Sequence, residues 1–128
     1  MIPRFQVWNK ATKEVHEADD IITIDFEEKQ ICVKTLFFGK VSYYDLDDVV
    51  LMQSTGFRDK NGKEIFEGDI VDSEDGILSG IVEFRPDLGM FVSTLIKYNN
   101  FERLCNVADS VYIIGNIYTN PELAEERS

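Results

Sequence analysis

The chain has 128 residues, of which 44% are hydrophobic and 12% aromatic, a composition that fits a folded domain and excludes a disordered chain. Its 13 basic and 24 acidic residues give a net charge of −11, which argues against direct nucleic-acid binding, because such proteins concentrate positive charge. No apolar run approaches the ~18 residues of a membrane helix, and the N-terminus lacks the apolar core of a signal peptide. We therefore expect a soluble cytoplasmic protein without a membrane partner.

The first part of the chain alternates short apolar, β-branched runs with polar turns, which predicts β-strands. We expect strands at residues 4–9, 14–16, 21–26, 30–35, 41–44 and 49–53. The two-residue period of a strand would place Ile22, Ile24 and Phe26 on one face. Residues 45–48 read either as a helical turn or as a loop.

The block from Ser54 to Val71, STGFRDKNGKEIFEGDIV, is dense in turn residues. The Asp59 side chain can accept hydrogen bonds from backbone N–H groups two residues on, and Gly62 adopts a left-handed conformation at little cost. These features predict a hairpin. A calcium loop is the alternative, but it fails because Phe57 and Gly68 stand where such a loop needs acidic ligands.

The second part of the chain continues with strands, expected at residues 69–73, 80–84, 89–95 and 111–117. Residues 99–106 read as a short helix, because Phe101, Leu104 and Cys105 would share one helical face. Pro121, preceded by Asn120, predicts the start of a short helical tail.

Strands at intervals of roughly ten residues, without a long amphipathic helix, predict a mainly β protein. We expect an antiparallel β-barrel or sandwich-like fold with short helical segments, forming a single domain over residues 1–128. Within it, an N-terminal β-meander (1–52), a barrel-like unit (53–120) and a short tail (121–128) are candidate subdomains.

The chemistry-bearing residues form no recognisable catalytic, cofactor or metal site. His16 is the single histidine, has no nucleophile near it in sequence, and is expected in an exposed loop. Cys32 and Cys105 lack a C-x-x-C pattern and read as small buried hydrophobes. Clustered acids are expected to be solvated rather than to bind metal. They are Asp19 and Asp20; Asp45, Asp47 and Asp48; Glu64, Glu67 and Asp69; and Glu125 and Glu126. We therefore predict that the chain is not an enzyme.

Aromatic residues recur along the predicted strands, where core packing is expected. They are Trp8, Phe37, Phe38, Tyr43, Tyr44, Phe84, Phe91 and Tyr98. If exposed, they would instead form a protein interface, or a stacking platform for single strands if basic residues lay beside them.

Four stretches of the chain stand out as motifs: RFQVWN at the start, Met52 to Val71, GIVEF at 80–84, and VYIIGNIYTNPEL at 111–123. Together they resemble the YopX family of phage and prophage proteins. Asn9 stands where the family usually has Asp. The resemblance implies a phage or prophage origin, the bacterial cytoplasm, and a small β-rich fold with oligomers. It supplies no catalytic residues.

Three functional hypotheses follow. The first is a non-enzymatic protein-interaction or assembly module that forms homo-oligomers and binds a host or phage protein. The second is a single-stranded nucleic-acid-binding accessory protein, and the third an acidic DNA mimic that inhibits a host protein. The second needs a basic patch, for which the candidates are Arg58, Lys60, Lys63, Arg85 and Lys97.

Overall fold

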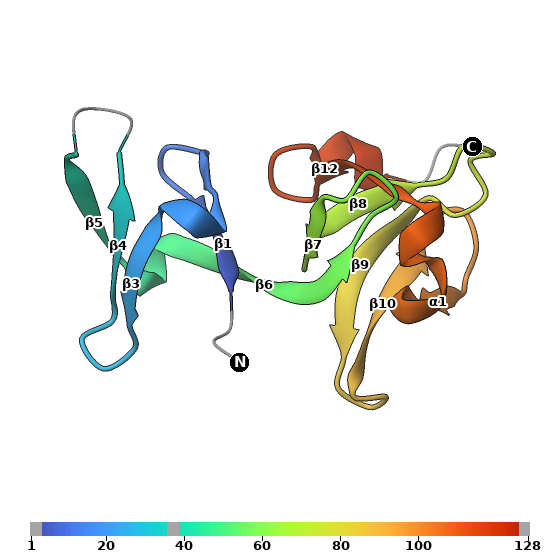
Figure 1. Cartoon of the computed structure of the whole chain (residues 1–128), viewed down its shortest axis with the longest axis horizontal. Coiled ribbons are helices and arrows are strands. Elements are labelled where there is room, and N and C mark those ends of the chain that lie inside the picture. The colour runs from blue at the N-terminus through green and yellow to red at the C-terminus, as the bar shows by residue number, and fades with distance from the viewer. Residues whose placement is uncertain (1–3, 36–38, 126–128) are drawn as a thin grey trace. The chain divides into compact units, whose positions relative to one another are not determined.

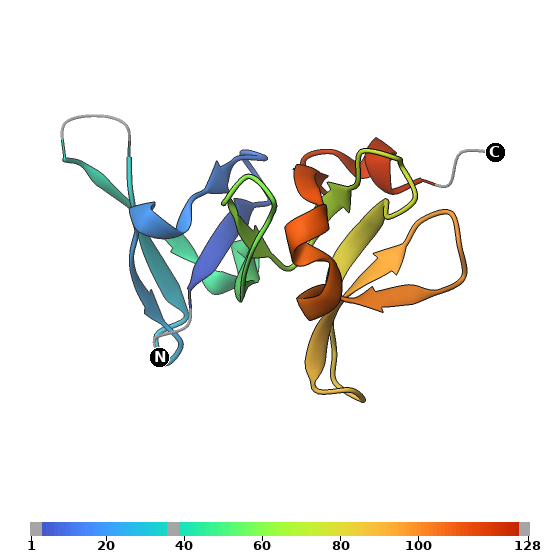
Figure 2. The same cartoon turned by 45° about the vertical axis from the view of Figure 1, so that its right-hand side comes forward.

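The computed structural model describes residues 4–35 and 39–125 (Figures 1 and 2). The fold is mainly β with antiparallel strands, which confirms the predicted class. Contacts within the chain divide it into two compact units, unit 1 at residues 1–53 and unit 2 at 54–128. One long strand, β6 (Val49–Arg58), crosses this boundary and contributes to both.

Unit 1 holds two short sheets. Besides β6, its strands are β1 (Phe5–Asn9), β2 (Val15–His16), β3 (Ile21–Asp25), β4 (Gln30–Lys34) and β5 (Val41–Asp45). Two 3-10 helices, η1 (Ala18–Asp20) and η2 (Leu46–Asp48), precede β3 and β6. β1 pairs with both β2 and β6, while β3, β4 and β5 form a separate three-stranded sheet. These positions confirm the strands expected from alternating apolar runs and turns.

The core of unit 1 is small and aliphatic. Val7, Ile31, Val33 and Val49 are buried at its centre. Around them pack the partly buried Ile21, Ile24, Tyr44, Leu46 and Leu51.

A β-bulge at Ile22 breaks the regular alternation of β3. Ile21 pairs with Val33 and Thr23 with Cys32, so Ile22 is an extra residue in its strand. A bulge shifts which side chains face the core. The expectation that Ile22, Ile24 and Phe26 share one face is therefore wrong. Ile24 packs against the core, whereas Ile22 and Phe26 are 46% and 62% exposed.

Unit 2 is larger, and its strands curl into a half-barrel (Figure 1). β7 (Glu64–Phe66) pairs with the second part of β6. A five-stranded sheet has the order β11 (Phe101–Arg103), β10 (Met90–Leu95), β9 (Gly80–Arg85), β8 (Asp69–Asp72) and β12 (Tyr112–Asn116). Helices are short: α1 (Leu104–Val107), η3 (Ala108–Ser110) and η4 (Pro121–Ala124). Its buried core consists of Ile65, Val71, Val82, Leu104, Val107, Ala108 and Val111.

The short helix expected over residues 99–106 is present only from Leu104, as α1, and the expected shared face of Phe101, Leu104 and Cys105 is wrong. β11 occupies Phe101–Arg103, and α1 is a single turn that buries Leu104 and Val107, three residues apart. Successive residues of an α-helix are rotated by about 100°, so the residue after Leu104 leaves the buried face and Cys105 is exposed. Burial is confirmed for Cys32 and wrong for Cys105. Pro121 does open a helical turn, as predicted.

Candidate functional site

An apolar groove in unit 1, here called the β3 groove, is the strongest candidate for a functional surface. It has a volume of about 510 Å³ and lies between the start of β1 and the strand β3. Its lining residues are Arg4, Phe5, Ala18, Ile21, Ile22, Thr23, Ile24 and Phe26. Five of these eight are large aliphatic or aromatic residues, so the groove mainly offers apolar contacts.

Two side-chain contacts join β1 to the segment that leads into β3. Gln6 Nε2 donates to Glu17 Oε2 at 2.8 Å, and Gln6 is buried. Arg4 Nη2 lies 3.0 Å from Asp19 Oδ1. Both members of that ion pair are substantially exposed, so it contributes about 0–1 kcal/mol and mainly sets position. These contacts hold one wall of the β3 groove in place.

The turn that ends β3 is held by Asp25. Its Oδ1 accepts hydrogen bonds from the backbone N–H groups of Glu27 (3.0 Å) and Glu28 (2.9 Å). Lys29 completes the turn with a left-handed backbone at φ 57°. Because β3 ends at Asp25, the Phe26 side chain is placed in the turn, where it is exposed beside the β3 groove.

The surroundings of the β3 groove are acidic. Between residues 17 and 28 the chain has no lysine or arginine. Its acids there are Glu17, Asp19, Asp20, Asp25, Glu27 and Glu28. Among the described lining residues, Arg4 is the one cation, and it is paired with Asp19. An apolar groove with an acidic rim suits a partner that carries apolar and basic side chains.

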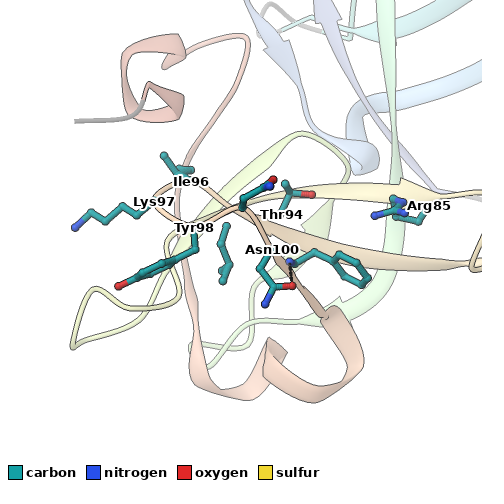
Figure 3. Close-up of a pocket in the computed structure, with 9 residues that line it drawn as sticks. Arg85, Thr94, Ile96, Lys97, Tyr98 and Asn100 are labelled. Carbon is teal, nitrogen blue, oxygen red and sulfur yellow. Dashed lines mark hydrogen bonds between the residues drawn. The ribbon is translucent and has the colours of Figure 1, made fainter. Parts of the chain in front are cut away.

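A second pocket, also of about 510 Å³, lies in unit 2 beside the loop from β10 to β11. It is lined by Arg85 and by residues 94–101, and Figure 3 shows Lys97 and Tyr98 at one end with Arg85 at the other. Arg85 makes two hydrogen bonds to the Asp87 carboxylate, at 2.9 and 2.8 Å, and these bonds lower the pKa of Asp87. Arg85 also lies over the Phe101 ring, 4.8 Å from its centre. Its charge is therefore already engaged within the protein.

The candidate basic residues divide between this pocket and the hairpin. Arg85 and Lys97 line the pocket, but Arg58, Lys60 and Lys63 are not among its lining residues. Arg58 donates to the Gly62 carbonyl at 2.8 Å, and Lys60 contacts Glu74 and lies 5.5 Å from the centre of the Tyr112 ring. Because these basic side chains make separate contacts within the protein, they offer little support for the continuous basic patch that nucleic-acid binding needs.

His16 does not lie in an exposed loop, so that expectation is wrong. It belongs to β2, is partly buried, and its ring centre is 5.7 Å from that of Tyr44. Its Nε2 is buried without a hydrogen bond in the described structure. Pairing of β2 with β1 places His16 within a sheet. The polar residues on either side of His16 in the sequence do not predict this pairing.

The acidic clusters do not assemble into a metal centre within residues 4–35 and 39–125, where no group of three or more His, Cys, Asp or Glu side chains has a metal-binding arrangement. Glu126 of the last cluster lies outside the described residues. One of these acids, Asp69, was expected to be solvated, but it is buried and accepts a hydrogen bond from Phe66 N at 2.8 Å.

In the hairpin block, the buried side chain of Asp59 stabilises its own turn and connects that turn to β12. Its Oδ1 accepts from Asn61 N and Lys63 N, both at 2.9 Å, which confirms the predicted turn. Its Oδ2 accepts from Ile113 N of β12 at 3.0 Å. Sequence reasoning missed this third bond, because its partner is 54 residues away.

Asn9 forms a smaller turn of the same kind. Its Oδ1 accepts from Ala11 N (2.9 Å) and Thr12 N (3.1 Å). An aspartate oxygen accepts such bonds equally well, so the Asn at this position preserves the turn.

The aromatic residues are only partly in the core. Tyr44 and Phe91 pack against the two cores, as expected. Core packing was the wrong expectation for Tyr43, Phe84 and Tyr98, which are exposed. Phe37 and Phe38 lie outside the described residues.

Within the described parts of the chain, no helix is long and apolar enough to cross a bilayer.

Comparisons with known proteins agree on the fold. A family model described as YopX protein matches residues 4–125. A search of curated proteins finds no match. The crystal structure of protein EF1440 from Enterococcus faecalis is similar over 98% of this chain and 99% of that chain, with a TM-score of 0.70 and 28% identity. The crystal structure of protein yopX from Bacillus subtilis is similar over 94% of this chain and 96% of that chain, with a TM-score of 0.63 and 24% identity.

Proposed function

This chain belongs to the YopX protein family, as its motifs led us to expect, and from that premise we propose that it is a non-enzymatic protein-interaction module. We further propose that it is encoded by a phage or prophage and acts in the bacterial cytoplasm, on the basis of the resemblance. The contact surface in this proposal is the β3 groove.

The observation that carries the proposal is the exposed apolar surface around the β3 groove. Ile22 is 46% exposed and Phe26 is 62% exposed, and both line a groove of about 510 Å³. Exposed apolar side chains that gather at one concave place are typical of binding sites, whereas scattered ones are not. Fully burying one such side chain against a partner contributes up to about 1.5–3 kcal/mol, so Ile22 and Phe26 would supply part of the binding free energy.

The test is an affinity capture from bacterial lysate, with nuclease present, of the unaltered chain and of the variant Ile22→Asp. Because Ile22 is exposed, the variant should fold normally, which circular dichroism checks. The matched control is Ile77→Asp, which makes the same chemical change at an isoleucine of unit 2 that is 54% exposed. We expect Ile22→Asp to lose the captured protein and Ile77→Asp to keep it. Equal capture by both variants would remove the β3 groove from the proposal.

The same capture, repeated with and without nuclease, separates the rival functions. A partner released by double-stranded DNA favours the acidic mimic, and material that disappears with nuclease favours the nucleic-acid accessory. Self-association stays a prediction, which sedimentation velocity of the pure chain tests.

A further inference from the structure

The β3 groove adjoins a free strand edge. β3 pairs with β4 on one side, and in the described parts of the chain no strand pairs with its other side. After the bulge at Ile22, residues Thr23, Ile24 and Asp25 run in regular register with β4. A free edge presents backbone N–H and C=O groups that an added strand can pair with.

Apolar contacts lie beside this edge, where an added strand would place its side chains. Ile22, which the bulge leaves exposed, and Phe26, in the turn after β3, are its two most exposed apolar lining residues. The volume of about 510 Å³ falls within the range of about 300–1,000 Å³ typical of ligand sites. A strand rises about 3.3 Å per residue, so an added segment of about five residues would span β3.

The charge around the free edge of β3 distinguishes two possible binding partners, a second copy of this chain and a segment of another protein. The acidic run from Glu17 to Glu28 flanks the β3 groove at both ends of β3. A second copy of this chain would bring the same acids against it and would itself carry a net charge of −11. Lysine or arginine side chains on either side of an apolar strand would instead be attracted.

We propose that the β3 groove binds an extended apolar segment of another protein, flanked by lysine or arginine, which adds to the free edge of β3 as a further strand. This inference rests on the proposed function and specifies the partner. Main-chain hydrogen bonds to β3 supply affinity, alternate side chains enter the β3 groove, and the basic flanks meet its acidic rim.

The probe is a surface-displayed library of random peptides of about twelve residues, selected on the full chain and counter-selected on Ile22→Asp. We expect enrichment of peptides with alternating apolar residues and basic flanks. Selected peptides are then synthesised, and their affinities are measured by fluorescence anisotropy. Ile22→Asp should weaken binding at least about ten-fold and Ile77→Asp less than about two-fold. Enrichment of acidic, helical or proline-rich peptides, or no enrichment, would overturn the proposal.

Backbone methylation tests strand addition directly. Methylating alternate amides of a selected peptide removes the N–H donors along one of its two edges. One of the two methylated versions should bind about ten-fold or more weakly, because two or three hydrogen bonds are lost, and the other should bind as before. Equal binding by both versions would exclude strand pairing.

The acidic rim is tested by the double variant Glu27→Gln with Glu28→Gln. It should weaken a basic-flanked peptide about three- to ten-fold at low salt, with the difference shrinking above 0.15 M, where the Debye length is about 8 Å. Glu122→Gln in η4 is the control and should leave affinity unchanged.

Deletion of residues 2 and 3 tests the chain's own N-terminus as occupant, since a gain of ten-fold or more in affinity would show that it competes for the β3 groove. Capture that depends on Ile22, together with failure of the peptide experiments, would leave the interaction function standing and overturn this inference alone.

Discussion

Individual polar side chains organise the turns of this protein. Asp59 satisfies three backbone N–H groups, two in its own turn and one in β12, and Asn116 Oδ1 accepts from Tyr118 N and Thr119 N in the last turn. Both residues belong to stretches that resemble the YopX family. Their hydrogen bonds give these polar residues a structural role within the motifs.

Asp59→Asn should destabilise unit 2 by about 1–3 kcal/mol. One amide oxygen can replace Oδ1, but the amide NH₂ would then face the Ile113 N–H and leave a buried donor without an acceptor. Urea unfolding measures the loss. The control Asp109→Asn, at an exposed position, should change stability by less than about 0.5 kcal/mol. An unchanged midpoint for Asp59→Asn would show that the bond to β12 is dispensable.

Gly68→Ala should cost more stability than Gly62→Ala. Both glycines have left-handed backbones, at φ +85° and +82°, so each alanine brings strain of about 1–2 kcal/mol. At Gly62 an added Cβ meets nothing within 4 Å, whereas at Gly68 it would lie 3.3 Å from Tyr118 Cε2. Denaturant midpoints give the comparison, and adding Tyr118→Ala should remove the difference. Equal costs from the start would mean that the Tyr118 ring moves aside freely.

Among the secondary-structure elements, short length and irregularity decide which side chains reach solvent. The bulge in β3 exposes Ile22, and the single turn of α1 exposes Cys105 while burying Leu104. In both cases a regular period predicts the wrong face, because the element departs from that period or is too short to display it.

The two cysteines should therefore differ in reactivity. In the native protein a thiol reagent such as DTNB should modify Cys105, which is exposed, and leave Cys32, which is 5% exposed, unreacted until the protein unfolds. Counting the released chromophore before and after adding urea makes the measurement. The variant Cys105→Ser should abolish the native reaction. Fast modification of Cys32 in this variant would mean that β4 opens readily.

For the whole molecule, the division into two units gives each its own hydrophobic core. The core of unit 1 centres on Val7, Ile31, Val33 and Val49, and none of these belongs to the core cluster of unit 2. Separate cores allow separate local unfolding.

The acidic excess acts on the whole surface, since a net charge of −11 opposes self-association and favours basic partners.

Ile31→Ala should remove about 2–5 kcal/mol of packing from unit 1, since Ile31 is fully buried. Hydrogen exchange read by mass spectrometry should show faster exchange in β1, β4 and β5, with β9 and β10 nearly unchanged. Val82→Ala, in the core of unit 2, is the reciprocal variant. If either variant accelerates exchange equally in both units, the chain unfolds as the single domain that its sequence led us to expect.

The mainly β class, the positions of most strands and the Asp59 turn follow from the sequence, because they depend on local properties: β-branched runs, alternation and turn residues. The tertiary structure alone decided what happens between segments. It placed Asp59 against β12, His16 against Tyr44 and the start of β1 beside β3. The β3 groove is such a product, since its walls come from two strands and a 3-10 helix, and the bulge that exposes Ile22 is defined only by pairing with β4. Local preference can predict a strand, but only its partners determine its register and which of its edges stays free.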